Sequence, residues 1–144
     1  MSGFLVDTNV LSEFSRRGEP NAKVKGWLKA ASPSSLYVSI LTLAELRRGI
    51  ELLAPSKRRD QLEQWLETDL LQSFDDANVL PVTKAIADRW ASLSAQAQRK
   101  GVQLAVLDGL IAATAFEHDL SVVTRNVKDF AGLGVDVFSP WDAE

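Results

Sequence analysis

Residues 4–14 read FLVDTNVLSEF, and this stretch decides which fold the rest of the chain has to complete. A short run of strand-forming residues, Phe4–Val6, stops at Asp7, and Thr8 and Asn9 follow before apolar residues recur at helical spacing. Asp, Thr and Asn accept hydrogen bonds from the free N–H groups at a helix start, so one interpretation of Asp7 is a helix cap. The other is that Asp7 stands at the carboxyl end of a parallel strand, where α/β sheets gather ligands and metals.

Further apolar runs have the length and residue types of short strands. They are Leu36–Ile40, Val79–Val82, Ser121–Thr124 and Val135–Phe138. Their apolar residues are consecutive rather than alternating, which is typical of strands covered on both faces. The helical patterns between them are Pro20 to Ala31, a segment capped by Ser56, a segment capped by Thr83, and Leu107 to His118. This alternation predicts a single α/β domain over residues 1–144, with a mainly parallel, roughly five-stranded sheet between two layers of helices.

Composition excludes several kinds of protein and of chemistry. Hydrophobic residues make up 46% of the chain and charged residues 24%, as in ordinary globular proteins. No apolar run could cross a membrane, the start has no signal-peptide pattern, and cysteine is absent, so we expect a cytoplasmic protein without disulfides. His118 is the single histidine, which excludes a His/Cys zinc site. Hydrolytic chemistry would have to rest mainly on carboxylates and hydroxyls, with or without a bound metal.

Two acidic residues lie among apolar neighbours on predicted helices. Glu45, in SILTLAELRRGIELL, shares a helical stripe with Leu41 and Leu52. It is either a boundary residue whose carboxylate reaches water or part of a site. Asp108, in QLAVLDGLIAATAF, precedes residues that we expect to be buried. An unpaired buried carboxylate is costly, so Asp108 needs a partner, a capping role at the helix start, or a cation.

A later strand also ends in polar residues. In SVVTRNVKDF, the residues Thr124, Asn126 and Asp129 form either an ordinary turn or part of a site with Asp7. Carboxylates from distant segments would then meet at one edge of the sheet, where their repulsion raises their pKa values unless a cation compensates it. Oxygen ligands favour Mg²⁺ or Mn²⁺, and such an ion can activate water for attack on a phosphate.

Taken together, these stretches resemble the PIN-domain ribonucleases and, within them, the VapC-type toxins of bacterial toxin–antitoxin systems, including the FitB-like branch. The resemblance runs from LVDTNVLSE through SILTLAELRRGI and LAVLDGLIAATAFEHDLSVVTRNVKDF to VFSPW, and so extends from end to end. It implies a three-layer α/β/α PIN-like fold. It also implies metal-dependent hydrolysis of RNA phosphodiester bonds by water, with Mg²⁺ as the cofactor and Mn²⁺ as a substitute.

The resemblance assigns residues as well. Asp7, Glu45 and Asp108 match the family's acidic metal-binding triad and are expected to be catalytic. Many members carry Asp directly after TR, where this chain has Asn126, and others carry an acid three residues later, where Asp129 stands. Either residue could be the fourth ligand or position a water, and the charge missing at Asn126 predicts weak or single-metal occupancy before substrate binds. Polar residues that match positions around the site, with turn or cap bonding as the alternative, are Thr8, Asn9, Ser39 and Thr124.

The implied partners are an RNA substrate and a cognate antitoxin, in a homodimer or a higher toxin–antitoxin assembly. An apolar helical segment of the antitoxin is expected along the helical pair at residues 41–72. The formal net charge of −3 leaves RNA contacts to local basic patches. Arg16 and Arg17 are the first candidates because they lie nearest to Asp7 in sequence. The other candidates are Arg47–Arg48, Lys57–Arg59 and Arg99–Lys100.

Two other functions remain open. A catalytically silent module would keep the fold in order to bind a partner or nucleic acid; Asn126 favours this reading and the intact acidic triad opposes it. A phosphatase that acts through an aspartyl intermediate would need a second Asp two residues after Asp7, where the chain has Asn9.

Overall fold

The centre of the fold is a parallel sheet, in a computed structural model that describes residues 3–15 and 18–142. Its five strands follow the order β3-β2-β1-β4-β5, and all pairs are parallel. The strands are β1 (Phe4–Val6), β2 (Leu36–Ser39), β3 (Val79–Leu80), β4 (Ser121–Val123) and β5 (Val137–Phe138). Central β1 places Leu5 opposite Tyr37 of β2 and opposite Val122 of β4. The predicted parallel sheet is confirmed.

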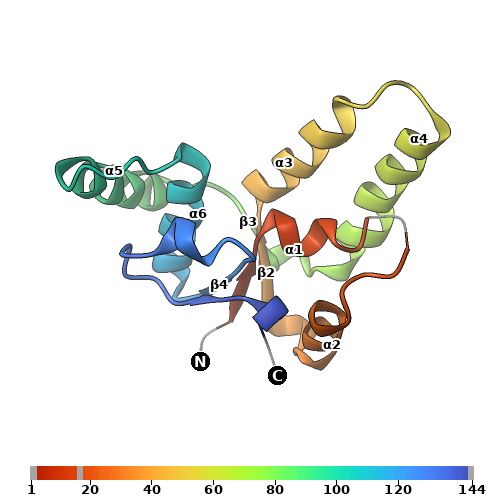
Figure 1. Ribbon diagram of the computed structural model, residues 1–144, viewed down its shortest axis with the longest axis horizontal. Coiled ribbons are helices and arrows are strands. Elements are labelled where there is room, and N and C mark those ends of the chain that lie inside the picture. The colour runs from red at the N-terminus through yellow and green to blue at the C-terminus, as the bar shows by residue number, and fades with distance from the viewer. Residues whose placement is uncertain (1–2, 16–17, 143–144) are drawn as a thin grey trace.

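Helices cover both faces of this sheet. The α-helices of the described chain are α1 (Thr8–Ser12), α2 (Ala22–Ala30), α3 (Ile40–Glu51), α4 (Lys57–Gln64), α5 (Lys84–Arg99) and α6 (Val106–His118). Figure 1 shows α5 and α6 on one side of the strands and α1 to α4 on the other, so the predicted three-layer architecture is confirmed. None of the described helices has the length and apolar character needed to cross a membrane.

Short tighter or wider turns complete the chain. A π-helix, η2 (Trp65–Leu70), continues α4. The 3-10 turns are η1 (Pro33–Ser35), η3 (Leu71–Ser73), η4 (Asp76–Asn78), η5 (Val127–Phe130) and η6 (Pro140–Asp142). Along the chain, η5 precedes the edge strand β5 and η6 follows it.

Successive residues of the central strands pack into different layers. Leu5 and Val122 are fully buried against the α5 and α6 layer, whereas Val6 and Val123 are fully buried against the other layer. Because side chains alternate across a strand, a strand covered on both faces must be apolar throughout. This is the physical reason for the consecutive apolar runs in the sequence.

β2, β3, β4 and β5 are shorter than the predicted apolar runs, whereas β1 has its predicted bounds. Ser39 accepts a hydrogen bond from Leu41 N at 3.0 Å and caps α3, so Ile40 is helical rather than part of β2. Pro81 follows β3 and cannot donate to a sheet ladder. The predicted caps Ser56 and Thr83 are confirmed, since their hydroxyls accept from the third residue of α4 and α5.

A close contact between α5 and α6 generates a test of this packing. A Cβ added to buried Gly109 would lie 2.8 Å from Trp90 Cδ1 and 3.1 Å from Leu104 Cδ2. Gly109→Ala is therefore expected to lower the free energy of unfolding by about 1–3 kcal/mol through overpacking, as measured by urea denaturation. Gly26→Ala in α2 is the matched control, because its added Cβ meets nothing within 4 Å; it should stabilise by about 0.5–1 kcal/mol. Equal stabilities of the two variants would show that Trp90 moves aside without cost.

Candidate active site

Polar side chains from distant segments meet where β1 and β4 end. These neighbouring strands pair Val6 with Val123, and Asp7 N donates to Val123 O at 2.9 Å. Asp7 and Thr124, the residues that follow the two strands, are therefore side by side. Since all strands are parallel, this edge is the carboxyl edge of the sheet, where α/β folds place their ligands.

Asp7 is held by hydrogen bonds to both of its carboxylate oxygens. Oδ1 accepts from Thr8 N at 2.9 Å, which makes Asp7 the cap of α1, and Oδ2 accepts from Thr124 Oγ1 at 2.9 Å. The cap and the strand-end interpretations are thus both correct. The side chain is 8% exposed, and burial raises its pKa although the bonds from Thr8 and Thr124 oppose the rise.

Thr124 fixes the direction of its own proton. Its hydroxyl oxygen accepts from Asn9 Nδ2 and from Asn126 N, each at 3.1 Å, so both lone pairs are occupied. The remaining hydroxyl hydrogen is donated to Asp7. Asn9 is held in turn, because its Oδ1 accepts from Arg125 N at 2.9 Å. This network supports the ionised, hydrogen-bond-accepting form of Asp7.

Glu45 is connected to the same network through Thr8. The Thr8 hydroxyl donates to Glu45 Oε1 at 2.8 Å, while the Thr8 backbone N–H donates to Asp7. One residue therefore sets the positions of two carboxylates from different elements. Glu45 is half-buried on α3, as expected for a boundary residue, and its bond to Thr8 also connects it to the other acids. Ser39, by contrast, caps α3 and makes no hydrogen bond to an acidic side chain.

Asp108 lies in the first turn of α6 but does not cap it. The cap position is Ala105, and the Asp108 carboxylate receives no hydrogen bond from the described part of the chain. The capping alternative for Asp108 is therefore wrong. Burial raises the pKa of Asp108 to about 6, with further contributions from the negative charges of Asp129, Asp7 and Glu45.

The acid that adds its charge to this cluster from the segment after β4 is Asp129. The negative charge of Asp129, in η5, contributes to the raised pKa values of both Asp7 and Asp108, so Asp129 lies near them. Asn126 serves the cluster with its backbone N–H, which donates to Thr124, while its side chain makes no hydrogen bond to the described chain. The sequence left these two positions as alternatives.

The carboxylates of this cluster are the candidate ligands of a metal ion. Within residues 3–15 and 18–142, no three acidic or histidine side chains lie in a coordinating arrangement as they stand. Their chemistry nevertheless fits a hard divalent cation, because the cluster offers only oxygen ligands. None of its carboxylates is paired with a described Lys or Arg. Repulsion separates carboxylates that share no cation, so the side chains would have to draw together around an ion.

Most basic candidates are engaged elsewhere or lie outside the described residues. Arg47 pairs with Glu51 at 3.5 Å, and Arg59 pairs with the same Glu51 at 2.9 Å. Arg16 and Arg17 lie outside the described residues. Sequence reasoning missed two cations in the segment after β4, Arg125 and Lys128; the available signal was that they flank Asn126 on the way to Asp129.

The raised pKa of Asp108 predicts how the stability of the metal-free protein depends on pH. An unfolded Asp releases its proton near pH 3.8, whereas folded Asp108 keeps it to about pH 6. The stabilisation from the neutral form is fully present below pH 3.8 and is lost as pH rises to about 6. In EDTA, Asp108→Asn should therefore have a higher Tm than wild type at neutral pH. The difference in Tm should shrink as the pH falls below about 6.

Asp75→Asn is the control for removing one exposed carboxylate that makes no hydrogen bond through its side chain. A Tm margin of Asp108→Asn that stayed constant across this pH range would contradict the assignment of a raised pKa to Asp108.

Known proteins match this chain over most of its length. The family model described as PIN domain matches residues 4–134. Toxin FitB of Neisseria gonorrhoeae is 39% identical over 137 residues, which cover 95% of this chain and 97% of that protein. VapC ribonuclease Y4jK of Sinorhizobium fredii is 37% identical over 138 residues, covering 96% of this chain and 97% of that protein.

Solved structures match the chain as well. The crystal structure of FitAcB from Neisseria gonorrhoeae matches with a TM-score of 0.89 at 39% identity, over 96% of this chain and 99% of that one. A toxin–antitoxin complex from Klebsiella pneumoniae matches with a TM-score of 0.71 at 31% identity, over 96% and 98% of the two chains. By sequence and by fold, the chain belongs to the PIN-domain family, in the group that includes toxin FitB and the VapC ribonucleases.

Proposed function

We propose that this chain is a metal-dependent endoribonuclease toxin that hydrolyses RNA phosphodiester bonds and is inhibited by a cognate antitoxin. The observation that carries the proposal is the carboxylate cluster, in which Asp7, Glu45, Asp108 and Asp129 come from separate elements and interact electrostatically without a described cationic partner. Similarity to a VapC ribonuclease over 96% of the chain supports the reaction, and similarity to a toxin–antitoxin complex supports the partner.

The chain's residues divide the work at this site. Mg²⁺ or Mn²⁺, held by the four carboxylates, would supply activation of water and neutralisation of charge at the phosphate. Asp7 is the fixed member, because both of its oxygens already accept hydrogen bonds. Asp108 keeps its lone pairs available, because nothing in the described chain donates to it. Thr8 and Thr124 orient their carboxylates from outside the coordination sphere, a role that is usually worth about 10–100-fold in activity.

Metal removal and loss of the fourth acid test the mechanism. Purified chain freed of antitoxin should cleave RNA with Mg²⁺ or Mn²⁺ and stop in EDTA. Asp129→Asn should lower kcat/KM by more than the roughly 10–100-fold expected for a residue outside the coordination sphere. Asn126→Ala should lower it less, because the backbone N–H that donates to Thr124 remains. Both are compared with Asp75→Asn, which should keep full activity.

Two outcomes would count against this mechanism. Cleavage that persists unchanged in Asp7→Asn would point to a contaminating nuclease. RNA or antitoxin binding by wild type without any metal-dependent cleavage would favour the catalytically silent binding module.

The Thr8 hydroxyl offers a separate test of carboxylate positioning. Thr8→Val removes the donor to Glu45 but keeps the backbone N–H that donates to Asp7. We expect kcat/KM to fall by about 10–100-fold and half-saturation to need more Mn²⁺. Thr8→Ser, which retains the hydroxyl, should stay close to wild type. If Thr8→Val shows the Mn²⁺ dependence of wild type, Glu45 is positioned without Thr8.

A groove beside the site fits the proposed antitoxin. It has a volume of about 240 Å³, lies between α1, α3 and α4, and includes Thr8 and Glu45 in its lining. Its apolar walls are Leu46, Ile50, Leu62 and Trp65. An apolar helical segment of the partner seated here would cover Glu45, in line with the expectation for residues 41–72. Added antitoxin should abolish cleavage, and cleavage that continues would refute the proposed inhibition by this partner.

The proposed homodimer is tested by sedimentation of the chain alone.

A further inference from the structure

The segments that follow β4 and β5 emerge at the same edge of the sheet as the carboxylates. Arg125 stands two residues after β4, and Trp141 stands three residues after β5. The strands are neighbours and parallel, with Val123 paired to Phe138. The two side chains therefore meet beside the site, although neither belongs to the carboxylate cluster.

Arg125 is held against an aromatic face. Its guanidinium carbon lies 5.2 Å from the centroid of the Trp141 ring, within the range of a cation–π interaction. Its backbone N–H donates to Asn9 Oδ1, so the main chain of Arg125 belongs to the network that fixes Asp7. Trp141 is half-buried in η6 and packs with the core on the α2 side of the sheet. The cation is thus placed by a ring that is itself packed against the core.

Among the residues that the structure describes, the guanidinium nevertheless has no acidic partner. Arg125 is exposed and forms no ion pair with any described carboxylate. An interaction with an aromatic ring leaves guanidinium N–H groups free, and their fork geometry matches two phosphate oxygens. Aromatic side chains with nearby cations are also the elements that bind single-stranded nucleic acids.

The charge of the site gives this cation a function. An RNA phosphate that approaches Asp7, Glu45, Asp108 and Asp129 meets their repulsion, and the chain as a whole carries a formal net charge of −3. A cation held at the same edge of the sheet would offset that repulsion where the RNA enters or leaves the site. Arg125 meets this requirement, because its backbone is bonded to Asn9, which in turn donates to Thr124 beside Asp7.

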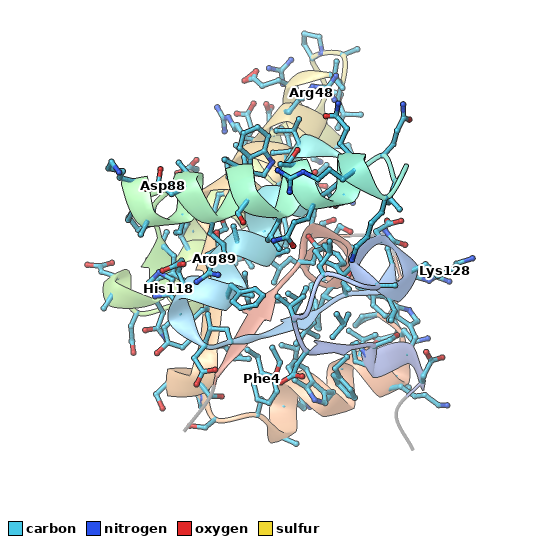
Figure 2. The ribbon with its side chains drawn as sticks, turned by 90° about the vertical axis from the view of Figure 1, so that its left-hand side faces the viewer. Phe4, Arg48, Asp88, Arg89, His118 and Lys128 are labelled. Carbon is cyan, nitrogen blue, oxygen red and sulfur yellow. The ribbon has the colours of Figure 1, made fainter. Side chains whose placement is uncertain are left out.

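We propose that Arg125, positioned by Trp141, binds a backbone phosphate of the RNA next to the bond that is cut. This inference rests on the proposed ribonuclease function and adds a substrate contact outside the carboxylate cluster. Lys128 is the competing cation on the same segment. It is exposed and unpaired among the described residues, but no ring holds it, and Figure 2 shows it projecting outward from η5.

The experiment is steady-state cleavage of a short labelled single-stranded RNA of mixed sequence with Mg²⁺ at several salt concentrations. Arg125→Gln should raise KM by roughly 10–100-fold, the loss expected for a charge-assisted contact, with a smaller effect on kcat. It should also make the dependence of log(kcat/KM) on log[salt] shallower by about 0.7, the value of one phosphate contact on a single strand. Trp141→Leu should shift KM in the same direction, and Trp141→Phe should shift it less.

The matched control is Lys29→Gln, which removes an exposed, unpaired cation near the end of α2, where the chain leads to the amino end of β2. It should leave both KM and the salt dependence unchanged. If Arg125→Gln lowers only Tm, the residue anchors the C-terminal turn and the inference fails. If Lys128→Gln instead of Arg125→Gln reduces the salt dependence, the contact belongs to Lys128.

A measurement on wild type protects the test against misfolded variants. Phenylglyoxal modification of Arg125, read by mass spectrometry, should be slowed by the same RNA in Ca²⁺, and unchanged modification would overturn the inference. The proposed function fails separately: wild type that cleaves no RNA with Mg²⁺ or Mn²⁺ refutes the ribonuclease, whereas active wild type with an unaffected Arg125→Gln refutes only the phosphate contact.

Discussion

The hydrogen bond from Thr124 Oγ1 to Asp7 Oδ2 joins the ends of two strands that are far apart in sequence. Thr124 can donate only to Asp7, because Asn9 and Asn126 occupy its lone pairs. The pairing of β1 with β4 brings these groups into reach, and the buried bond then fixes the carboxylate to the sheet. Hydrogen bonds connect this junction to Thr8, Asn9, Glu45, Arg125 and Asn126.

The edge concentrates negative charge that the fold does not neutralise. Burial and neighbouring negative charges raise the pKa values of Asp7 and Asp108, so the ionised forms of these two carboxylates oppose folding when no cation is bound. Hydrophobic layers on both faces of the sheet, built from residues such as Leu5 and Val6, supply the stability that tolerates this cost. Perturbed acids grouped at a strand edge are typical of a functional site rather than of a structural one.

The two sides of the carboxylate cluster differ in chemistry. On the side of α1, α3 and α4 lies an apolar groove that ends at Thr8 and Glu45. On the side of β4 and β5 lies Arg125 above Trp141. In our proposals the apolar side receives the antitoxin and the cationic side receives the RNA, so an inhibitor could cover Glu45 without reproducing the contacts of the substrate.

The sequence by itself determined the elements and the main acids. Apolar runs predicted the strands, the hydroxyls of Ser56 and Thr83 predicted helix starts, and Asp7 was recognised at a strand end. These signals act over a few residues, so they can be read from the chain. Only the tertiary structure decided that Asp129 lies near Asp7 and Asp108, and that the Thr8 hydroxyl reaches Glu45. Such pairings depend on strand register and helix packing between segments that are distant in sequence, 37 residues apart for Thr8 and Glu45, and no local pattern encodes them.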